Sequence, residues 1–276
     1  MIFEGQGLHT GARGRVSIEC RDGPFVLEKD GVRMGRSDFV VVDTTRSTAI
    51  ADPSRTVRVA TVEHLFAALA GLGIHGGVSV VVEGPELPLL DGASASWCRA
   101  LAGARAARDV ALLEVALRGE IAIGSSSYAF APSAATVVEV EVDFADARLA
   151  PRASWSGDAD DFAQRIASAR TFGFEHEVEA LLERGLASHV SPEAVVVVGR
   201  DRIFSSGAPF TADEPARHKL LDLLGDLWVH GGPPRGCVRA VRPGHAATHA
   251  AVAEAMARGI LRASRDAPAI QRLSRT

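Results

Sequence analysis

Three side chains that can bind a metal ion recur at every fourth position of one short stretch: His218, Asp222 and Asp226. On a helix this spacing places all three on one face, with neighbouring Cβ atoms roughly 5–6 Å apart. The other faces are apolar, with leucine at positions 220, 221, 223, 224 and 227. Unpaired polar groups on a buried helix are unfavourable by about several kcal/mol each. A bound metal ion is the simplest partner for this polar stripe.

A second stretch, Thr61-Val62-Glu63-His64-Leu65, offers the complementary chemistry. A catalytic zinc site commonly has three protein ligands and a water, so His64 is the best candidate to join His218 and Asp222. Glu63 supplies a carboxylate that can accept a proton from that water, as metal-assisted hydrolysis requires. The simpler alternative is that His64 only starts a helix and that the two aspartates form a solvated edge.

The chain is internally repetitive around these two stretches. The apolar run from His64 to Leu69 leads to His75-Gly76-Gly77, and the run from His218 to Leu224 leads to His230-Gly231-Gly232 at nearly the same distance. Each run predicts a helix that ends at glycine. Strand patterns flank both helices, at Val78 to Val82, Val137 to Phe144 and Val195 to Val198.

These patterns predict an α+β fold of two similar domains, residues 1–108 and 109–276, each with helices packed on a sheet. The boundary is expected near Arg105 to Val110, and loops are expected at Pro151 to Gly157 and Gly231 to Gly236. Gly71-Leu72-Gly73-Ile74-His75-Gly76 matches a dinucleotide-binding pattern. That pattern requires a preceding strand and a following helix, whereas here a helix precedes it, so we reject a dinucleotide site.

Bulk properties favour a cytoplasmic enzyme. The 276 residues are enough for a substantial core, and the formal charge of −4 provides no basic field for nucleic acid. Three widely spaced cysteines, Cys20, Cys98 and Cys237, give no disulfide framework and suit a reducing compartment. We expect neither a signal peptide nor a membrane span, because the longest apolar runs, such as Ala194 to Val198, are too short to cross a bilayer.

Six sequence blocks together resemble one known family. They are GQGLHTG (5–11), TVEHLFAALAGLGI (61–74), PELPLLDG (85–92), SARTFGF (168–174), RHKLLDLLGDL (217–227) and PGHA (243–246). In order and approximate spacing they resemble UDP-3-O-acyl-N-acetylglucosamine deacetylase, the zinc enzyme of the committed step in lipid A synthesis. The resemblance extends to about residue 260 and implies two α+β halves with the active site between them, a common location for ligand sites.

The resemblance implies roles for individual residues. It makes His64, His218 and Asp222 the zinc ligands and Glu63 the general base. His245, when protonated, would stabilise the oxyanion and pass a proton to the departing amine. Two further catalytic residues are implied: Asp226 would orient this imidazole and favour its cationic form, and the Thr171 hydroxyl would lie near the tetrahedral intermediate.

Substrate contacts are implied as well. Lys219, one of only two lysines in the chain, would bind a phosphate or hydroxyl of the substrate, and Phe144 would stack on uracil. Phe172 and Gly173 of the TFGF block complete the expected substrate-binding set. The simpler alternative for Lys219 is a surface lysine, as we expect for Lys29.

The chain also departs from the family pattern near the expected acyl passage. Arg184-Gly185-Leu186-Ala187-Ser188 is followed by His189-Val190 where the family usually has two glycines, and larger side chains there would narrow the passage. Glu175, His176 and Glu177 add charge where an apolar lining is expected. A basic residue often found near Ser126, which would meet the nucleotide phosphates, is absent.

We therefore predict a zinc-dependent hydrolase that removes the N-acetyl group from UDP-3-O-(3-hydroxyacyl)-N-acetylglucosamine, acting as a cytoplasmic monomer. One alternative is a related zinc deacetylase for another N-acetylated amino sugar, with a short acyl group or none. The other is a catalytically silent, zinc-containing binding protein. Glu63 and His245 argue against the silent protein, because structural zinc needs neither a base nor an acid.

Overall fold

The first half of the chain forms a five-stranded sheet in the order β1-β2-β8-β3-β4. Its strands are β1 (Ile2–Gln6), β2 (Arg13–Pro24), β3 (Val26–Lys29), β4 (Val32–Met34) and β8 (Gly76–Glu83). Neighbours are antiparallel except β3 and β8, which run parallel. The computed structural model describes residues 1–104, 112–178 and 189–264, so the expected boundary near 105–110 lies outside the described residues.

The second half repeats this topology strand for strand. Its sheet has the order β10-β11-β17-β12-β13, made of β10 (Gly119–Ile123), β11 (Ser126–Ala131), β12 (Thr136–Glu141), β13 (Arg152–Trp155) and β17 (Gly236–Val241). Again a single pair, β12 and β17, is parallel and the others are antiparallel. The internal duplication and the α+β fold predicted from the sequence are therefore confirmed.

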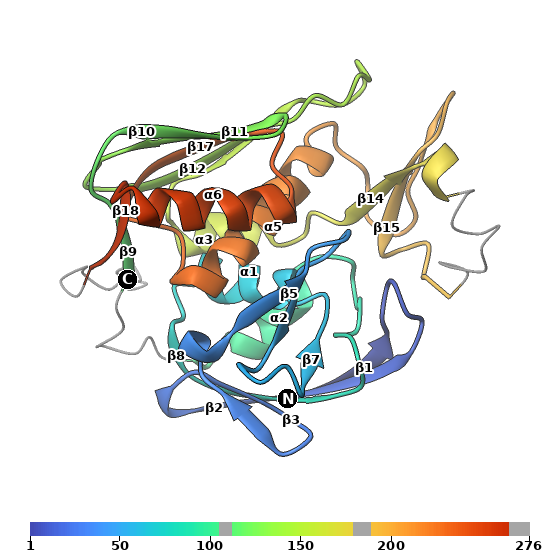
Figure 1. Cartoon of the computed structure of the whole chain (residues 1–276). Coiled ribbons are helices and arrows are strands. Elements are labelled where there is room, and N and C mark those ends of the chain that lie inside the picture. The colour runs from blue at the N-terminus through green and yellow to red at the C-terminus, as the bar shows by residue number, and fades with distance from the viewer. Residues whose placement is uncertain (105–111, 179–188, 265–276) are drawn as a thin grey trace, which may run out of the picture.

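Helices lie between the two sheets, which form the outer layers (Figure 1). They include α1 (Glu63–Gly71) and α2 (Ala95–Leu101) from the first half, and α5 (Glu214–His230) and α6 (His245–Ala257) from the second. The strands bury alternate residues against this helical layer, as in the pattern of β11. None of the helices in the described ranges is both long and apolar enough to cross a membrane.

Smaller elements complete the two halves. A three-stranded sheet of β5 (Val40–Asp43), β6 (Ala49–Ala51) and β7 (Arg58–Val59) precedes α1, and another of β14 (Thr171–Phe174), β15 (Val195–Val198) and β16 (Ile203–Phe204) precedes α5. A two-stranded sheet pairs β9 (Leu112–Val115) with β18 (Leu261–Ser264). The short helices are η1 (Arg36–Asp38), α3 (Ala159–Asp161) and η2 (Phe162–Ile166). Each half thus inserts a small sheet before its central helix.

The helix ends agree with the sequence prediction. Helix α5 ends at His230 and is capped by Gly231, whose φ of 138° is readily accessible only to glycine. Helix α1 is followed by Gly73 with φ of 65° and then by β8, so the rejected dinucleotide pattern indeed lies after a helix and before a strand. The Trp228 indole donates a hydrogen bond of 3.0 Å to the Ile74 carbonyl and so ties the two helix ends together.

Two predictions of local structure were wrong in part. Pro151 to Gly157, expected to be a loop, contains strand β13, because buried Trp155 and pairing with β12 outweigh the flanking proline and glycine. One strand was expected over Val137 to Phe144, but β12 ends at Glu141. The Val142 amide there donates to the Pro151 carbonyl, at the loop that connects β12 to β13.

The two halves approach each other closely where α1 crosses α5. Gly225 lies against the backbone of Glu63, and a Cβ at position 225 would clash with the Glu63 carbonyl oxygen. Beside this crossing Phe66 of α1 packs on Trp228 of α5, with ring centroids 4.6 Å apart. Glycine at position 225 therefore allows α1 and α5 to approach closely.

Replacing Gly225 by alanine should destabilise the fold by about 2 kcal/mol or more. Alanine normally stabilises a helix interior by about 1 kcal/mol relative to glycine. Overpacking costs about 3 kcal/mol at the upper end of its usual range, which we expect here because the added Cβ meets backbone that cannot rotate away. Urea denaturation measures the net effect. Gly35→Ala is the matched control, because position 35 is extended and its nearest neighbour to an added Cβ is 3.5 Å away. Equal stability of Gly225→Ala and wild type would contradict the close crossing.

Candidate metal centre and catalytic site

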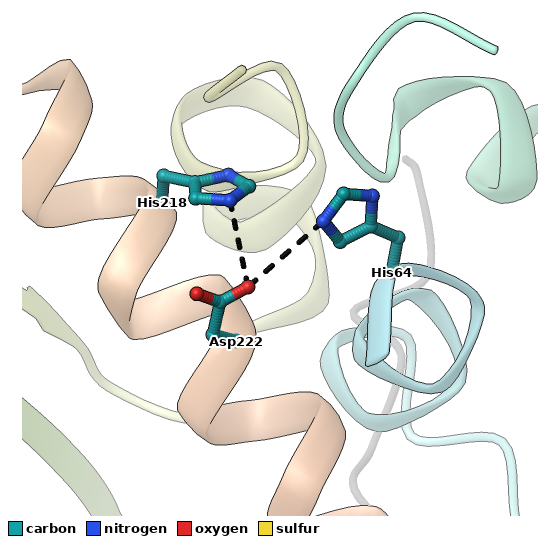
Figure 2. Close-up of side chains that lie close together, drawn as sticks. All are labelled: His64, His218 and Asp222. Carbon is teal, nitrogen blue, oxygen red and sulfur yellow. Dashed lines mark ion pairs between the residues drawn. The ribbon is translucent and has the colours of Figure 1, made fainter. Parts of the chain in front are cut away.

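The crossing of α1 and α5 brings three predicted ligands together. One ligand atom from each of His64, His218 and Asp222 lies within 4.8 Å of the other two. The Nε2 atoms of His64 and His218 lie 3.9 and 3.5 Å from Asp222 Oδ1. Figure 2 shows the histidine on α1 and the two side chains on α5 facing one another. This group is able to hold one metal ion.

Hydrogen bonds outside this group leave the facing atoms available. His218 Nδ1 lies 3.0 Å from the carbonyl oxygen of Ala169, so Nδ1 carries the hydrogen and Nε2 presents its lone pair. Lys219 Nζ donates to Asp222 Oδ2 at 2.7 Å, which leaves Oδ1 toward the histidines. The Ser94 hydroxyl donates to the His64 carbonyl at 2.7 Å and supports the start of α1.

Electrostatics keep these groups in the protonation states that metal ligands need. Burial, reinforced by the neighbouring His218, lowers the pKa of His64 to about 3, and burial also lowers the pKa of His218. Burial alone would raise the pKa of Asp222, but Lys219 and the nearby imidazoles hold it well below its usual range. Two neutral imidazoles and one carboxylate therefore face one another, a donor set that suits zinc.

A second polar cluster lies beside the ligands. His245, the first residue of α6, places Nδ1 2.9 Å from Asp226 Oδ2. Asp226 Oδ1 accepts a hydrogen bond of 2.6 Å from the Thr48 hydroxyl, and the Thr48 amide donates to Glu63 Oε2 at 3.0 Å. Thr48 thus connects the predicted base with the carboxylate that holds the predicted acid.

These neighbours shift the protonation of both predicted catalytic groups. Burial raises the pKa of the Glu63 carboxyl to about 7. Burial alone would lower the pKa of His245, but Asp226 and Glu63 raise it to about 9. Near neutral pH the site therefore holds a carboxylate able to accept a proton and an imidazolium able to donate one.

Of the two predicted substrate-binding aromatics, Phe172 lies next to His218 and Phe144 lies next to Phe172. The Phe172 ring contacts His218 and Phe144, with centroid separations of 6.1 and 5.8 Å. Gly173 follows in β14, where a Cβ would come within 3.1 Å of Val178. Thr171 begins this strand, and its amide donates to the Gly92 carbonyl at 2.7 Å. Strand β14 therefore starts two residues after Ala169, the hydrogen-bond partner of His218.

The residues that depart from the family pattern form contacts of their own. His189 Nε2 lies 2.8 Å from the Gly7 carbonyl oxygen, so this imidazole packs on the loop after β1. Glu175 and Glu177 accept hydrogen bonds from the backbone amides of Arg200 and Phe174. Arg184 to Ser188 lie outside the described residues. The two glutamates thus have structural partners, and no contact described tests the width of an acyl passage.

Sequence reasoning missed several residues of the site. Thr48 is fully buried but lies 15 residues before Glu63, where no spacing marks it. His249 lies 3.5 Å from Asp226 Oδ1 and 2.8 Å from His230. Its position four residues after His245 on α6 places both imidazoles on one helix face, and this signal was available in the sequence.

The geometry defines a class of protein. Two imidazoles and a carboxylate are grouped for a metal, and beside them lie a carboxylate that can accept a proton and an imidazolium that can donate one. This arrangement suits metal-assisted hydrolysis. Comparison with known proteins gives the family. A sequence model described as UDP-3-O-acyl N-acetylglycosamine deacetylase matches residues 1–257. The chain belongs to this family.

Similar proteins agree with this assignment over most of their length. UDP-3-O-acyl-N-acetylglucosamine deacetylase of Phenylobacterium zucineum is 36% identical over 268 residues, covering 93% of this chain and 91% of the relative. The protein of that name from Myxococcus xanthus is 34% identical over 272 residues, covering 92% and 83%. The one from Brucella melitensis biotype 2 is 38% identical over 256 residues, covering 89% and 88%.

Replacing Asp226 by asparagine should lower the pKa of His245 markedly, because the amide keeps the shape of the side chain but removes its charge. A folded-state pKa of about 9, above the unfolded value of about 6.5, means that His245 contributes stability that is fully present below about pH 6.5 and is lost as pH rises through about 9. Imidazole NMR titration measures the shift. Asp213→Asn, at the start of the same helix, is the control, and an unchanged pKa in Asp226→Asn would refute the pairing.

Proposed function

We propose that the chain is a zinc-dependent hydrolase that removes the N-acetyl group from UDP-3-O-(3-hydroxyacyl)-N-acetylglucosamine in lipid A biosynthesis. The observation that carries the proposal is the buried group of His64, His218 and Asp222 beside Glu63, in a chain that belongs to the deacetylase family along nearly its whole length. Free Cys20, Cys98 and Cys237 suit the reducing cytoplasm. We propose that it acts there as a monomer.

The donor set fits zinc. His64 Nε2, His218 Nε2 and Asp222 Oδ1 would hold the ion, and three protein ligands leave a position for water or substrate, as in catalytic zinc sites. When bound, the zinc would lower the pKa of a water molecule and polarise the acetamide carbonyl. Asp222 is the only carboxylate of the set, and Lys219 restrains it through the other oxygen.

Glu63 and His245 would move the protons. Glu63 directly precedes the ligand His64 in the sequence, and its carboxylate would accept a proton from the attacking water. His245 uses Nδ1 for Asp226, so Nε2 is the atom that would donate to the developing oxyanion and then to the departing amine. Asp226 would keep this imidazole charged and oriented, and Thr171 would donate from its hydroxyl to the tetrahedral intermediate.

The remaining residues would bind the substrate. Lys219 would contact a phosphate or hydroxyl group, and its raised pKa keeps it charged because the nearby Asp222 outweighs its burial. Phe144 would stack on the uracil ring, while Phe172 and Gly173 would line the approach beside His218. This surface suits a nucleotide-linked, acylated amino sugar.

Zinc binding and turnover should separate in two matched variants. His218→Ala should lose most of the bound zinc, because it removes one of three ligands. Glu63→Gln should keep about one zinc per chain and lose about 10²–10⁴-fold in turnover, the usual contribution of a general base. Metal analysis and a deacetylation assay on the same preparations measure both. His176→Ala, at an exposed position outside the metal group, is the control for zinc content. Full zinc occupancy in His218→Ala would contradict the ligand assignment.

Acyl-chain dependence tests the substrate. For the proposed substrate kcat/KM should rise steeply with acyl length, because each buried methylene contributes about 0.8 kcal/mol. If His189 and Val190 narrow the passage, kcat/KM would instead stay level or fall as the acyl chain lengthens. The double variant His189→Gly with Val190→Gly would then restore the rise in kcat/KM. That outcome would overturn the long-chain substrate and support a deacetylase for a smaller amino sugar. Ala134→Gly, at an exposed position of the loop between β11 and β12, is the control for a glycine substitution away from the passage.

A further inference from the structure

A buried hydrogen-bond chain extends from Asp226 away from the metal group and has no part in the mechanism above. Asp226 Oδ1 lies 2.6 Å from the hydroxyl oxygen of Thr48, which lies 3.0 Å from His249 Nε2. His249 Nδ1 lies 2.8 Å from His230 Nε2. Thr48, His249 and Asp226 are all at least 92% buried, and His230 is half-buried at the end of α5.

The hydrogens along this chain follow from counting donors. Asp226 is ionised, because its hydrogen bonds and the charge of His245 hold its pKa below the usual range despite burial. An ionised carboxylate only accepts, so the single Thr48 hydrogen is used toward Asp226. The Thr48 oxygen can then only accept from His249, which it does when His249 Nε2 carries a hydrogen.

His230 secures that arrangement from the other side. A neutral His249 with hydrogen on Nε2 presents a lone pair at Nδ1, so His230 Nε2 donates to it. If His249 is protonated, its Nδ1 donates to His230 instead. The pKa of His230 is lowered to about 4 by burial and by His249, so His230 is neutral near pH 7 and suits either role. In both states His249 keeps the hydrogen that faces Thr48.

Three separate segments meet in this chain. Thr48 lies just before β6, His230 is the last residue of α5, and His249 is on α6 one turn beyond His245. The titratable groups in contact with His249 are Asp226 and His230 on α5, and His245 on its own helix approaches the same Thr48 hydroxyl. These hydrogen bonds therefore connect the small sheet of the first half, at the start of β6, with α5 and α6 of the second half, which carry Asp226 and His245.

We propose that His249, with its tautomer fixed by His230, is a positioning residue for the Asp226 and His245 pair. The proposal rests on the proposed function. By donating to Thr48, His249 holds that hydroxyl on Asp226 Oδ1. This keeps the carboxylate turned toward His245 Nδ1, which lies 3.1 and 2.9 Å from its two oxygens, and so keeps His245 Nε2 oriented toward the substrate. This role requires no contact between His249 and the substrate, and His249 is not one of the three side chains grouped for a metal.

Kinetics of two variants test the positioning role. His249→Gln keeps an N–H donor near the Nε2 position and should retain kcat within about threefold of wild type. His249→Leu removes the donor and should lower kcat about tenfold or more with KM within about twofold, because it weakens a hydrogen bond that supports a charged group. Equal loss in both variants, or full kcat in His249→Leu, would overturn the proposal.

The tautomer can be measured directly in the zinc-loaded full chain without any substrate. ¹⁵N NMR of the imidazoles should show hydrogen on His249 Nε2 in the wild type, and mixed tautomers in His230→Leu but not in His230→Gln, which retains a donor. Hydrogen mainly on His249 Nδ1, with Nε2 bare, would overturn the proposal even if His249→Leu fails to fold. Because no turnover is needed, failure of the proposed deacetylase activity would leave this test intact.

Discussion

The close crossing of α1 and α5 is the contact on which the site depends. Gly225 allows the backbone of Glu63 to lie directly against α5. That approach sets His64 opposite His218 and Asp222, and it sets Glu63 beside the cluster of Asp226 and His245. The duplicated topology supplies one central helix from each half, so the site is formed by equivalent elements that carry different chemistry.

Charge balance explains how so many polar groups are buried together. Carboxylates at Asp222 and Asp226 would be strongly unfavourable alone, but each has a cationic partner, Lys219 for the first and His245 for the second. The balance divides the site into two parts. One part holds neutral imidazoles suited to a metal, and the other holds an imidazolium suited to proton donation.

Much of this arrangement was predictable because it depends on local periodicity. The four-residue spacing of His218, Asp222 and Asp226 predicted one helix face, and the repeated runs predicted two similar halves. Thr48 could not be found in this way, because its contacts join segments 178 and 201 residues apart in the chain. Gly225 was equally hidden, since only the packing of a second helix distinguishes it from a glycine that weakens a helix.

Anomalous diffraction at the zinc absorption edge, from crystals of the zinc-loaded chain, tests the central claim most directly. We predict one strong peak per chain bounded by His64 Nε2, His218 Nε2 and Asp222 Oδ1, with Glu63 next to it but not among the ligands. A zinc ion coordinated by other side chains, or one coordinated by a fourth protein ligand such as Glu63, would contradict a hydrolytic site at the crossing of the two helices.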